Sequence, residues 1–360
     1  MTHPHLTVNL ARIKHNARII VELCRRHGIE VTGVTKATCG DAKVAQAMLR
    51  GGVTGIGESH IENARRLKEA GITSPVMLLT VPPLSEVEAV VAIMDVSLNS
   101  ELSVLEALSL AALDQGRVHD VVVMVELGDL REGVMPEDLG GFLQQARGFA
   151  GIHIKGIGAN LTCFGGVAPD SENMNRLVKL AHETGDTLGR KPEWISGGNS
   201  SALNLIASGN MPRAVNHMRI GEAILLGRET MHRTPWPNTH QDAFLLHAEV
   251  VEEKEKPSLP QGRLVEDAFG HIPQFKDVGL IDRAIVNIGR EDVDIEGLIP
   301  LDPRLRILGG SSGYVILDVS RAGGSVQVGD EIVFSLNYAA LVAAMASPYI
   351  EKRHLDGGQT

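Results

Sequence analysis

The sequence predicts an α/β protein, a (β/α)8 TIM-like barrel followed by a smaller C-terminal β domain. Eight short β-branched runs alternate with amphipathic stretches over about 220 residues, which is the count and size of such a barrel. A doubly wound open sheet is the alternative, but no G-x-G-x-x-G follows the first strand. After Pro235 and Pro237 the alternation stops. We therefore expect a barrel over residues 1–235 and a β domain over 236–360, which a strand near 6–10 could also join.

The periodicity predicts each element in turn. The first helix is expected over 10–27. Barrel strands are expected at 29–35, 53–57, 75–81, 95–98, 120–127, 153–160, 194–196 and 214–219. Helices are expected at 43–50, 60–70, 85–92, 101–115, 136–149, 171–188 and 201–208, with Pro136 in a first helical turn. Strands of the β domain are expected at 243–251, 283–288, 314–319 and 331–336. The uncharged stretch 332–350 contains Asn337 and Pro348, so it predicts a strand and a short helix, not a membrane span.

Composition excludes several partners. The net charge is −10, with 34 basic and 44 acidic residues and no basic tract, which argues against nucleic acid. Three cysteines in no disulfide or zinc spacing, and no signal peptide, indicate a reducing, cytoplasmic setting away from membranes. We expect no metal site, and we expect His3 and His5 to lie in a mobile terminus.

Lys36 ends the first predicted barrel strand, and a turn containing Gly40 follows it. In a barrel, the side chains that do chemistry lie at the carboxyl ends of the strands. A lysine held there has the fixed position and partial desolvation that a Schiff-base amine needs. A surface lysine at a strand end is the alternative reading of this fragment taken alone.

The loops after the seventh and eighth strands are suited to phosphate. The run Ser196–Ser201 supplies bare glycine backbone and hydroxyl donors, and Gly221 follows Arg219 closely. Helix capping is the alternative role of the first loop. A guanidinium such as that of Arg219 would disfavour protonation of a pyridine nitrogen, because like charges repel. A pyridine ring that stays unprotonated would favour proton removal and return at Cα over transamination. An ion pair between Arg219 and Glu222 is the structural alternative for Arg219.

Six motifs in order carry a resemblance that covers essentially the whole chain. They are residues 34–41 (VTKATCGD), 128–133 (GDLREG), 158–163 (GANLTC), 196–201 (SGGNSS), 219–230 (RIGEAILLGRET) and 292–298 (DVDIEGL). With them the chain resembles the fold-type III alanine racemase superfamily, which depends on pyridoxal 5'-phosphate. Within that superfamily it is most similar to the ornithine racemase branch.

The resemblance implies specific roles. Lys36 would form the Schiff base with pyridoxal phosphate and act as the base on one face of Cα. Arg219 would face the pyridine nitrogen, and Arg131 the phenolic oxygen and substrate carboxylate. The residues implied in phosphate binding are Ser200, Gly221 and the amide of Ile220, with Ser201 or Asn199 assisting and Tyr338 contributed by the β domain. A buried aromatic side chain in a strand is the alternative for Tyr338.

The chain departs from the alanine racemases at the second base. Arg290 stands where those enzymes carry a tyrosine, and an arginine is a poor base at neutral pH. Cys163, at the place of a histidine, and Asp292 or Asp294 from a partner subunit are the open candidates. Cys163 could equally be a small buried side chain.

Asp292, Asp294 and Glu296 could meet a cationic substrate side chain, and a solvated acidic loop is the alternative. The resemblance thus implies a head-to-tail homodimer that racemises ornithine, with lysine, alanine or broad specificity as alternatives.

Other functions on similar architectures compete with this interpretation. A non-catalytic pyridoxal-phosphate homeostasis protein would be a single barrel, whereas about 120 residues follow this one. A D-threonine aldolase or D-serine dehydratase would use a metal held by the C-terminal domain, and the histidines there lack ligand spacing. A decarboxylase on a similar barrel is typically larger.

Overall fold

Two units make up the structure, a computed structural model that describes residues 4–270 and 272–356. One unit is Leu10–Gln241, and the other joins residues 4–9 to residues 242–356. The chain passes between the units after Gln241, so Pro235 and Pro237 lie inside the first unit and not at the boundary.

The first unit is a closed barrel of eight parallel strands, as the sequence predicts. The strands are β2 (Glu30–Val34), β3 (Gly55–Glu58), β4 (Val76–Leu78), β5 (Val96–Asn99), β6 (His119–Met124), β7 (Ile152–Gly158), β8 (Trp194–Ser196) and β9 (His217–Ile220). Each pairs with its neighbours in chain order, and β9 closes the barrel on β2. The carboxyl ends of all eight strands therefore meet at one rim.

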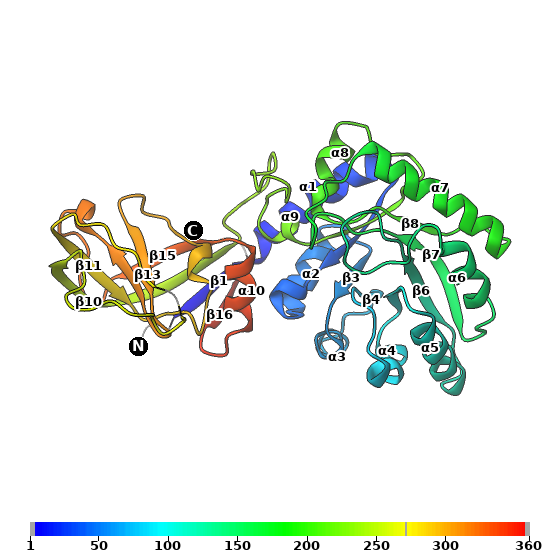
Figure 1. Cartoon of the computed structure of the whole chain (residues 1–360), viewed down its shortest axis with the longest axis horizontal. Coiled ribbons are helices and arrows are strands. Elements are labelled where there is room, and N and C mark those ends of the chain that lie inside the picture. Colours follow the sequence, from blue (N-terminus) through cyan, green and yellow to red (C-terminus); the bar gives the residue numbers. More distant parts are fainter. Residues whose placement is uncertain (1–3, 271, 357–360) are drawn as a thin grey trace. The chain divides into compact units, whose positions relative to one another are not determined.

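Helices surround these strands (Figure 1). They are α1 (Leu10–Arg26), α2 (Ala42–Arg50), α3 (Ile61–Glu69), α4 (Val87–Ile93), α5 (Leu102–Asp114), α6 (Leu139–Ala146), α7 (Ser171–Leu188), α8 (Leu203–Ala207) and α9 (Glu222–Leu225). Inside the barrel, aliphatic side chains of β4, β5 and β6 pack together with Trp194 of β8. Burying such side chains on both faces of each strand explains why the strands are so rich in Val and Ile.

One helix start was predicted wrongly. Helix α6 begins at Leu139, so Pro136 lies in the turn before it and not in its first helical turn. By contrast, α7 has the expected bounds, because Asp170 caps it. The Asp170 carboxylate accepts from the amide of Asn173, and the Asn173 side chain accepts in return from the amide of Asp170.

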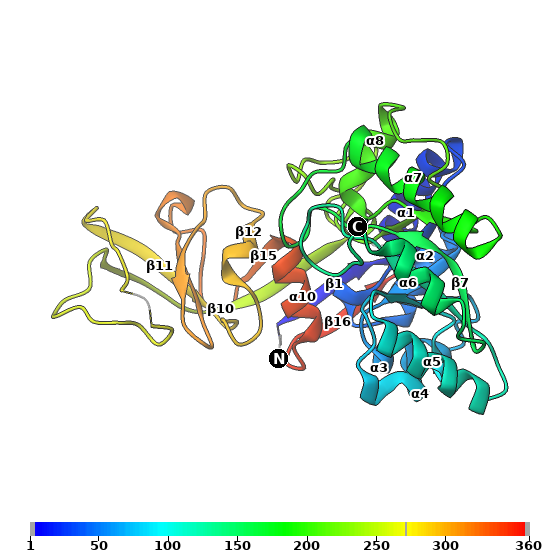
Figure 2. The same cartoon turned by 45° about the vertical axis from the view of Figure 1, so that its right-hand side comes forward.

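In the described residues, the second unit is a sheet of eight strands with one α-helix. Its strands are β1 (His5–Asn9), β10 (Phe244–Pro257), β11 (Leu280–Val286), β12 (Leu298–Pro300), β13 (Arg306–Gly310), β14 (Val315–Asp318), β15 (Glu331–Leu336) and β16 (Glu351–Leu355). The order is β12-β15-β10-β11-β14-β13, and β1 pairs with β10 and with β16. Figure 2 shows β10 running the length of this unit. Helix α10 (Tyr338–Ala346) follows β15, as the uncharged stretch predicts.

In the part of the chain that the structure describes, no helix is both long and apolar enough to cross a membrane.

Candidate active site

Lys36 stands at the rim of the barrel, two residues after β2. It opens the short 3-10 turn Lys36–Thr38, and the amide of Thr35 donates to the carbonyl of Gly57 (3.0 Å), which ties this turn to β3. The chain then reverses through Cys39 and Gly40, both at positive φ (52° and 65°). A Cβ on Gly40 would lie 2.8 Å from Cβ of Asn63, so only glycine fits there. The turn therefore holds the Lys36 backbone in a fixed position.

The Lys36 amine has a lowered pKa. The Lys36 side chain as a whole is exposed to solvent. The ammonium group is nevertheless partly desolvated by the surrounding rim, and this desolvation lowers its pKa. Among the charged neighbours, Cys163 raises the pKa, Arg131 lowers it, and Glu132 raises it. These three side chains, together with Glu58, which also raises the pKa, are the electrostatic surroundings of the amine.

Arg131 connects two of those neighbours. Its Nη1 donates to Sγ of Cys163 (3.1 Å), and its Nε and Nη2 donate to the carboxylate of Glu132. The structure thus brings together Lys36, Arg131 and Cys163, all three proposed from the sequence. Glu132 was missed, although it adjoins Arg131 in the motif. Cys163 is exposed, which excludes the alternative of a small buried side chain.

A buried aspartate shapes the loop that presents Cys163. The Asp129 carboxylate accepts from the amides of Cys163 (3.2 Å), Phe164 (2.9 Å) and Val167 (3.3 Å). Thr162 adopts φ 54°, a strained conformation for a β-branched residue, and its hydroxyl donates to the carbonyl of Val167 (3.0 Å). The loop after β7 is therefore pinned at both ends.

A second carboxylate lies buried beneath the Lys36 turn. Glu58, the last residue of β3, accepts hydrogen bonds from the Thr35 hydroxyl and from Nδ2 of Asn63 (2.9 Å). Burial raises the pKa of Glu58, and the two hydrogen bonds oppose that effect. Although the sequence places Glu58 at a strand end, it does not reveal this bracing of Thr35.

The loops after β8 and β9 meet, as a phosphate site requires. Ser200 Oγ accepts from the amide of Ala223 (3.2 Å), and a Cβ on Gly221 would lie 3.1 Å from Val34. Ser201 Oγ is buried and has no hydrogen-bond partner among the described residues. A buried hydroxyl left without a partner is costly, and phosphate oxygens would satisfy it. These residues therefore fit the phosphate of a bound cofactor.

The Asn199 side chain forms hydrogen bonds within the loops at this rim. Its Nδ2 donates to Oδ1 of Asn160 (3.2 Å) and to the carbonyl of Leu161 (2.8 Å), and its Oδ1 accepts from the amide of Ser201 (2.9 Å). Because its side-chain amide is committed to protein partners, the Asn199 side chain shapes the loop that carries Ser200 and Ser201.

Arg219 is buried inside the barrel and forms no ion pair with Glu222, which pairs instead with Arg233 (2.8 Å). Arg219 donates from Nη1 to the Ser196 hydroxyl and from Nη2 to the carbonyl of Ala159 (2.7 Å). Burial, with Arg131 nearby, lowers the pKa of Arg219 to about 10, so it stays cationic at neutral pH. Ile220 follows it as the last residue of β9.

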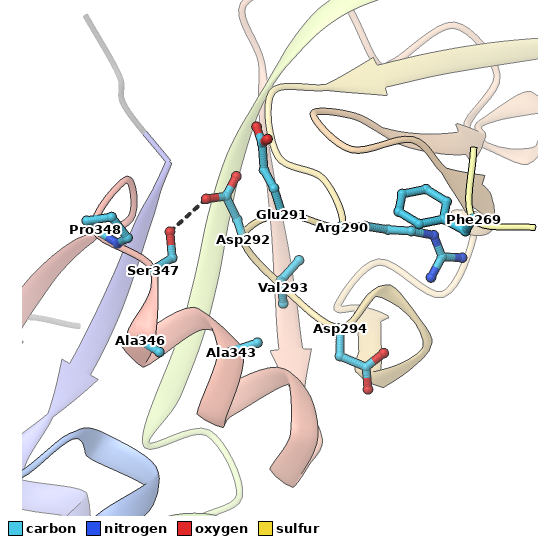
Figure 3. A pocket seen from close by; sticks show the side chains of 10 residues that line it. All are labelled: Phe269, Arg290, Glu291, Asp292, Val293, Asp294, Ala343, Ala346, Ser347 and Pro348. Carbon is cyan, nitrogen blue, oxygen red and sulfur yellow. Dashed lines mark hydrogen bonds between the residues drawn. The ribbon is translucent and has the colours of Figure 1, made fainter.

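The β domain holds the acidic candidates. A pocket of about 580 Å³ is lined by Asp292 and Asp294, together with Phe269, Arg290, Ser347 and neighbours (Figure 3). Asp292 accepts from the Ser347 hydroxyl (2.6 Å). Arg290 is not a base, because it forms two hydrogen bonds with Glu296 (2.7 and 3.1 Å) that raise its pKa. Tyr338 is half-buried and begins α10, so it is not a strand aromatic.

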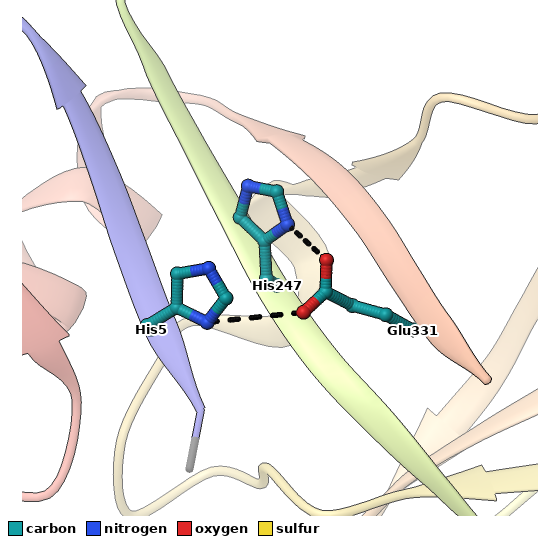
Figure 4. A group of neighbouring side chains, drawn as sticks. All are labelled: His5, His247 and Glu331. Atoms are coloured by element: carbon teal, nitrogen blue, oxygen red, sulfur yellow. Dashed lines mark hydrogen bonds and ion pairs between the residues drawn. The ribbon is translucent and has the colours of Figure 1, made fainter. Parts of the chain in front are cut away.

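One trio of possible metal ligands occurs among the described residues, namely His5, His247 and Glu331 (Figure 4). The two imidazoles are stacked, with centroids 4.3 Å apart and 10° between their planes. Parallel rings do not direct their lone pairs at one point, so the trio fits a side-chain contact between β1, β10 and β15. His5 lies in β1, not in a mobile terminus, whereas His3 lies outside the described residues.

Comparisons with known proteins show which family the chain belongs to. The family described as "Alanine racemase, N-terminal domain" matches residues 8–229. An ornithine racemase of Acetoanaerobium sticklandii is 41% identical over 98% of this chain and 100% of its own. A lysine racemase of Thermotoga maritima is 40% identical over 98% of both chains.

Solved structures show the same fold. An alanine racemase of Clostridium difficile 630 superposes with a TM-score of 0.75 at 18% identity, over 100% of this chain and 97% of the other. One of Bartonella henselae with covalently bound pyridoxal phosphate has a TM-score of 0.74 at 17% identity, over 99% and 100%. The chain therefore belongs to the alanine racemase family, a family of pyridoxal phosphate-dependent amino-acid racemases.

Proposed function

We propose that this protein interconverts the L and D forms of amino acids with a cationic side chain, ornithine first and lysine next. The observation that carries the proposal is the juxtaposition of an amine and a thiol at one rim. Cys163 and Arg131 both act electrostatically on Lys36, and Arg131 donates directly to Cys163. Racemisation needs two groups that exchange a proton with opposite faces of one carbon.

Lys36 would bind pyridoxal phosphate covalently, and the bound cofactor supplies the electron sink that acidifies Cα. The lowered pKa of Lys36 favours its neutral, nucleophilic form. When released from the cofactor by substrate, the amine takes the proton from one face of Cα. Ser200, Ser201, Gly221 and Ile220 would hold the phosphate, with Tyr338 as a further candidate.

Cys163 is our proposed second base. The Cys163 thiol gives a proton to the face of Cα opposite Lys36, and the resulting thiolate accepts the hydrogen bond from Arg131, whose charge stabilises it. In the reverse direction the thiolate takes the proton and the Lys36 ammonium returns one. Arg219 would disfavour protonation of the pyridine nitrogen of the bound cofactor, and this would limit electron withdrawal and transamination.

The choice of substrate follows from charge in the β-domain pocket. Burial raises the pKa of Asp294, and the adjacent Glu296 raises it further. A substrate ammonium beside Asp292 and Asp294 would relieve that unfavourable crowding of carboxylates. The full-length relatives with about 40% identity are named for ornithine and lysine, which supports the same choice. We propose that a head-to-tail homodimer brings one subunit's β domain to its partner's barrel.

We further propose a cytoplasmic setting, away from membranes and nucleic acid. All three cysteines are free of disulfides, Cys24 in the core and Cys39 and Cys163 with access to solvent, which suits a reducing compartment.

The test uses the purified protein loaded with pyridoxal phosphate, and Lys36→Ala as the variant. We expect wild type to be yellow and to racemise ornithine and lysine at least about 10-fold faster than alanine, as a desolvated charge pair implies. Lys36→Ala should lose both colour and activity, whereas Lys43→Ala, at an exposed position on α2, should keep both. A coloured Lys36→Ala would refute the assignment of the lysine, and faster turnover of alanine would refute the assigned substrate class.

A further inference from the structure

A buried imidazole lies behind Arg219. His217 and Arg219 are two residues apart on β9, so their side chains leave the strand on the same face. His217 is fully buried, and its ring stacks on Trp194 with centroids 4.1 Å apart and 5° between the planes. No step proposed above uses His217.

Hydrogen bonds link the Arg219 guanidinium to the His217 imidazole through Ser196, and the donor and acceptor of each bond can be assigned. Arg219 can only donate, so the Ser196 hydroxyl accepts from its Nη1. The hydroxyl proton of Ser196 is then free to go to Nδ1 of His217 (2.7 Å). Among the described residues Nδ1 is the only acceptor recorded for that buried proton, so the chain is fully satisfied when Nδ1 accepts and the ring proton is on Nε2, where it faces Oγ1 of Thr32 (2.9 Å). The chain therefore requires a neutral His217 in its Nε2–H form.

The surroundings keep the imidazole in that form. Burial lowers the pKa of His217 well below the usual value, and the positive charges of Arg219 and Lys155 lower it further. Lys155 lies over the Trp194 ring, 4.8 Å from its centroid. Ser196 belongs to β8 and Thr32 to β2, the two strands on either side of β9. His217 thus joins three adjacent strands beneath the guanidinium.

We propose that His217 is a positioning residue, which orders the Ser196 hydroxyl so that Arg219 is held with its charge directed at the pyridine nitrogen of the cofactor. This inference rests on the proposed function for the direction of Arg219, but the hydrogen-bond chain stands in the protein without cofactor. Without the imidazole, the Ser196 hydroxyl would have no fixed acceptor for its proton and could rotate. The neutral imidazole removes that freedom and adds no second positive charge beside Arg219.

The first test needs no cofactor. In apoprotein labelled with ¹⁵N-histidine, the His217 resonances, assigned by their loss in His217→Asn, should report a neutral ring protonated at Nε2 from about pH 5.5 to 8.5, because its pKa is far below the usual value. A ring that titrates near the ordinary value of about 6.5, or that carries its proton on Nδ1, would overturn the proposal. This outcome is independent of whether Lys36 binds the cofactor.

The second test compares two substitutions in the loaded enzyme. His217→Asn keeps an acceptor close to the place of Nδ1, whereas His217→Leu removes it at similar volume. We expect His217→Leu to weaken cofactor binding and to increase the share of turnovers that end in keto acid, each about 10-fold, the size of one hydrogen bond to a charged group. His217→Asn should stay within about 3-fold of wild type in both measurements.

Equal cofactor affinity and equal keto-acid yield in wild type and His217→Leu would refute the role. If His217→Leu does not fold, Ser196→Ala breaks the same chain at its next member and should give the same two changes. Thr32→Val breaks only the far end and should change both less than Ser196→Ala does. An unaltered Ser196→Ala enzyme would equally refute the proposal.

Discussion

Lys36 is surrounded by charges that act on it in opposite directions. Arg131 lowers the pKa of its amine and Glu132 raises it, while the two neighbours are paired with each other. Removing either one therefore leaves the effect of the other on the Lys36 pKa unopposed. The pair tunes the pH at which Lys36 becomes a nucleophile.

Two neutral substitutions should shift that pH in opposite directions. Glu132→Gln removes an anion that raises the pKa of Lys36, so the amine should deprotonate at lower pH than in wild type. Arg131→Gln removes a cation that lowers the pKa, so deprotonation should need higher pH. The measurement is the pH profile of covalent capture of pyridoxal phosphate by apoprotein. Shifts of the same sign in both variants would contradict this account.

How far sequence reasoning reached differs from residue to residue. Lys36, Ser200 and Arg219 could be proposed because each ends or follows a barrel strand, where chemistry in this fold belongs. His217 and Ser196 could not be assigned their roles, since a hydrogen-bond chain depends on which way side chains turn across three strands. Their only sequence signal is polarity within otherwise apolar strands.

The loop after β7 is held by one buried carboxylate. Asp129 follows β6, yet it accepts three backbone amides of the loop that carries Cys163. One element thus fixes the position of the proposed base on another. Asp129 itself is buried, and loss of such a charged acceptor costs about 1–3 kcal/mol.

Asp129→Asn should loosen this loop, because the amide that replaces one carboxylate oxygen cannot accept. We expect faster hydrogen exchange at the amides of Cys163, Phe164 and Val167 and at least about a 10-fold lower kcat, from loss of positioning. The matched control is Asp170→Asn at the N-cap of α7, where asparagine caps almost as well. Equal exchange rates in wild type and Asp129→Asn would contradict the role.

Among the elements, the barrel strands and most helices could be predicted because burial gives them a clear period. The missed strands are those with weak patterns. Strand β12 has three residues, β13 contains Gly309 and Gly310, and β16 is mostly charged or polar. Each is defined by its pairing with a distant strand, which local composition does not reveal.

At the scale of the whole molecule, the proposed chemistry is divided between the two units. Lys36, Arg131 and Cys163 belong to the barrel, whereas Asp292, Asp294 and Tyr338 belong to the β domain. If a dimer joins one subunit's barrel to its partner's β domain, each complete site draws on two chains.

Mixing two impaired variants should then restore activity. Lys36→Ala and Asp292→Asn each damage every site of their own homodimer. After the subunits are unfolded and reassociated together, random pairing gives one intact site in half of the dimers, hence about a quarter of wild-type activity on ornithine. Activity no greater than the mean of the two parents would contradict a shared site. Full activity of Asp292→Asn alone would remove Asp292 from the substrate pocket.

Strand β1 gives this molecule an unusual order of assembly. It is made before the barrel begins at Leu10, but its partners β10 and β16 are made from residues 244–257 and 351–355. During translation, residues 10–241 can form the barrel before either partner strand of β1 has been synthesised. For most of synthesis an unpaired strand therefore precedes a folding domain, and its free backbone N–H and C=O groups can pair with other chains until β10 and β16 have been made.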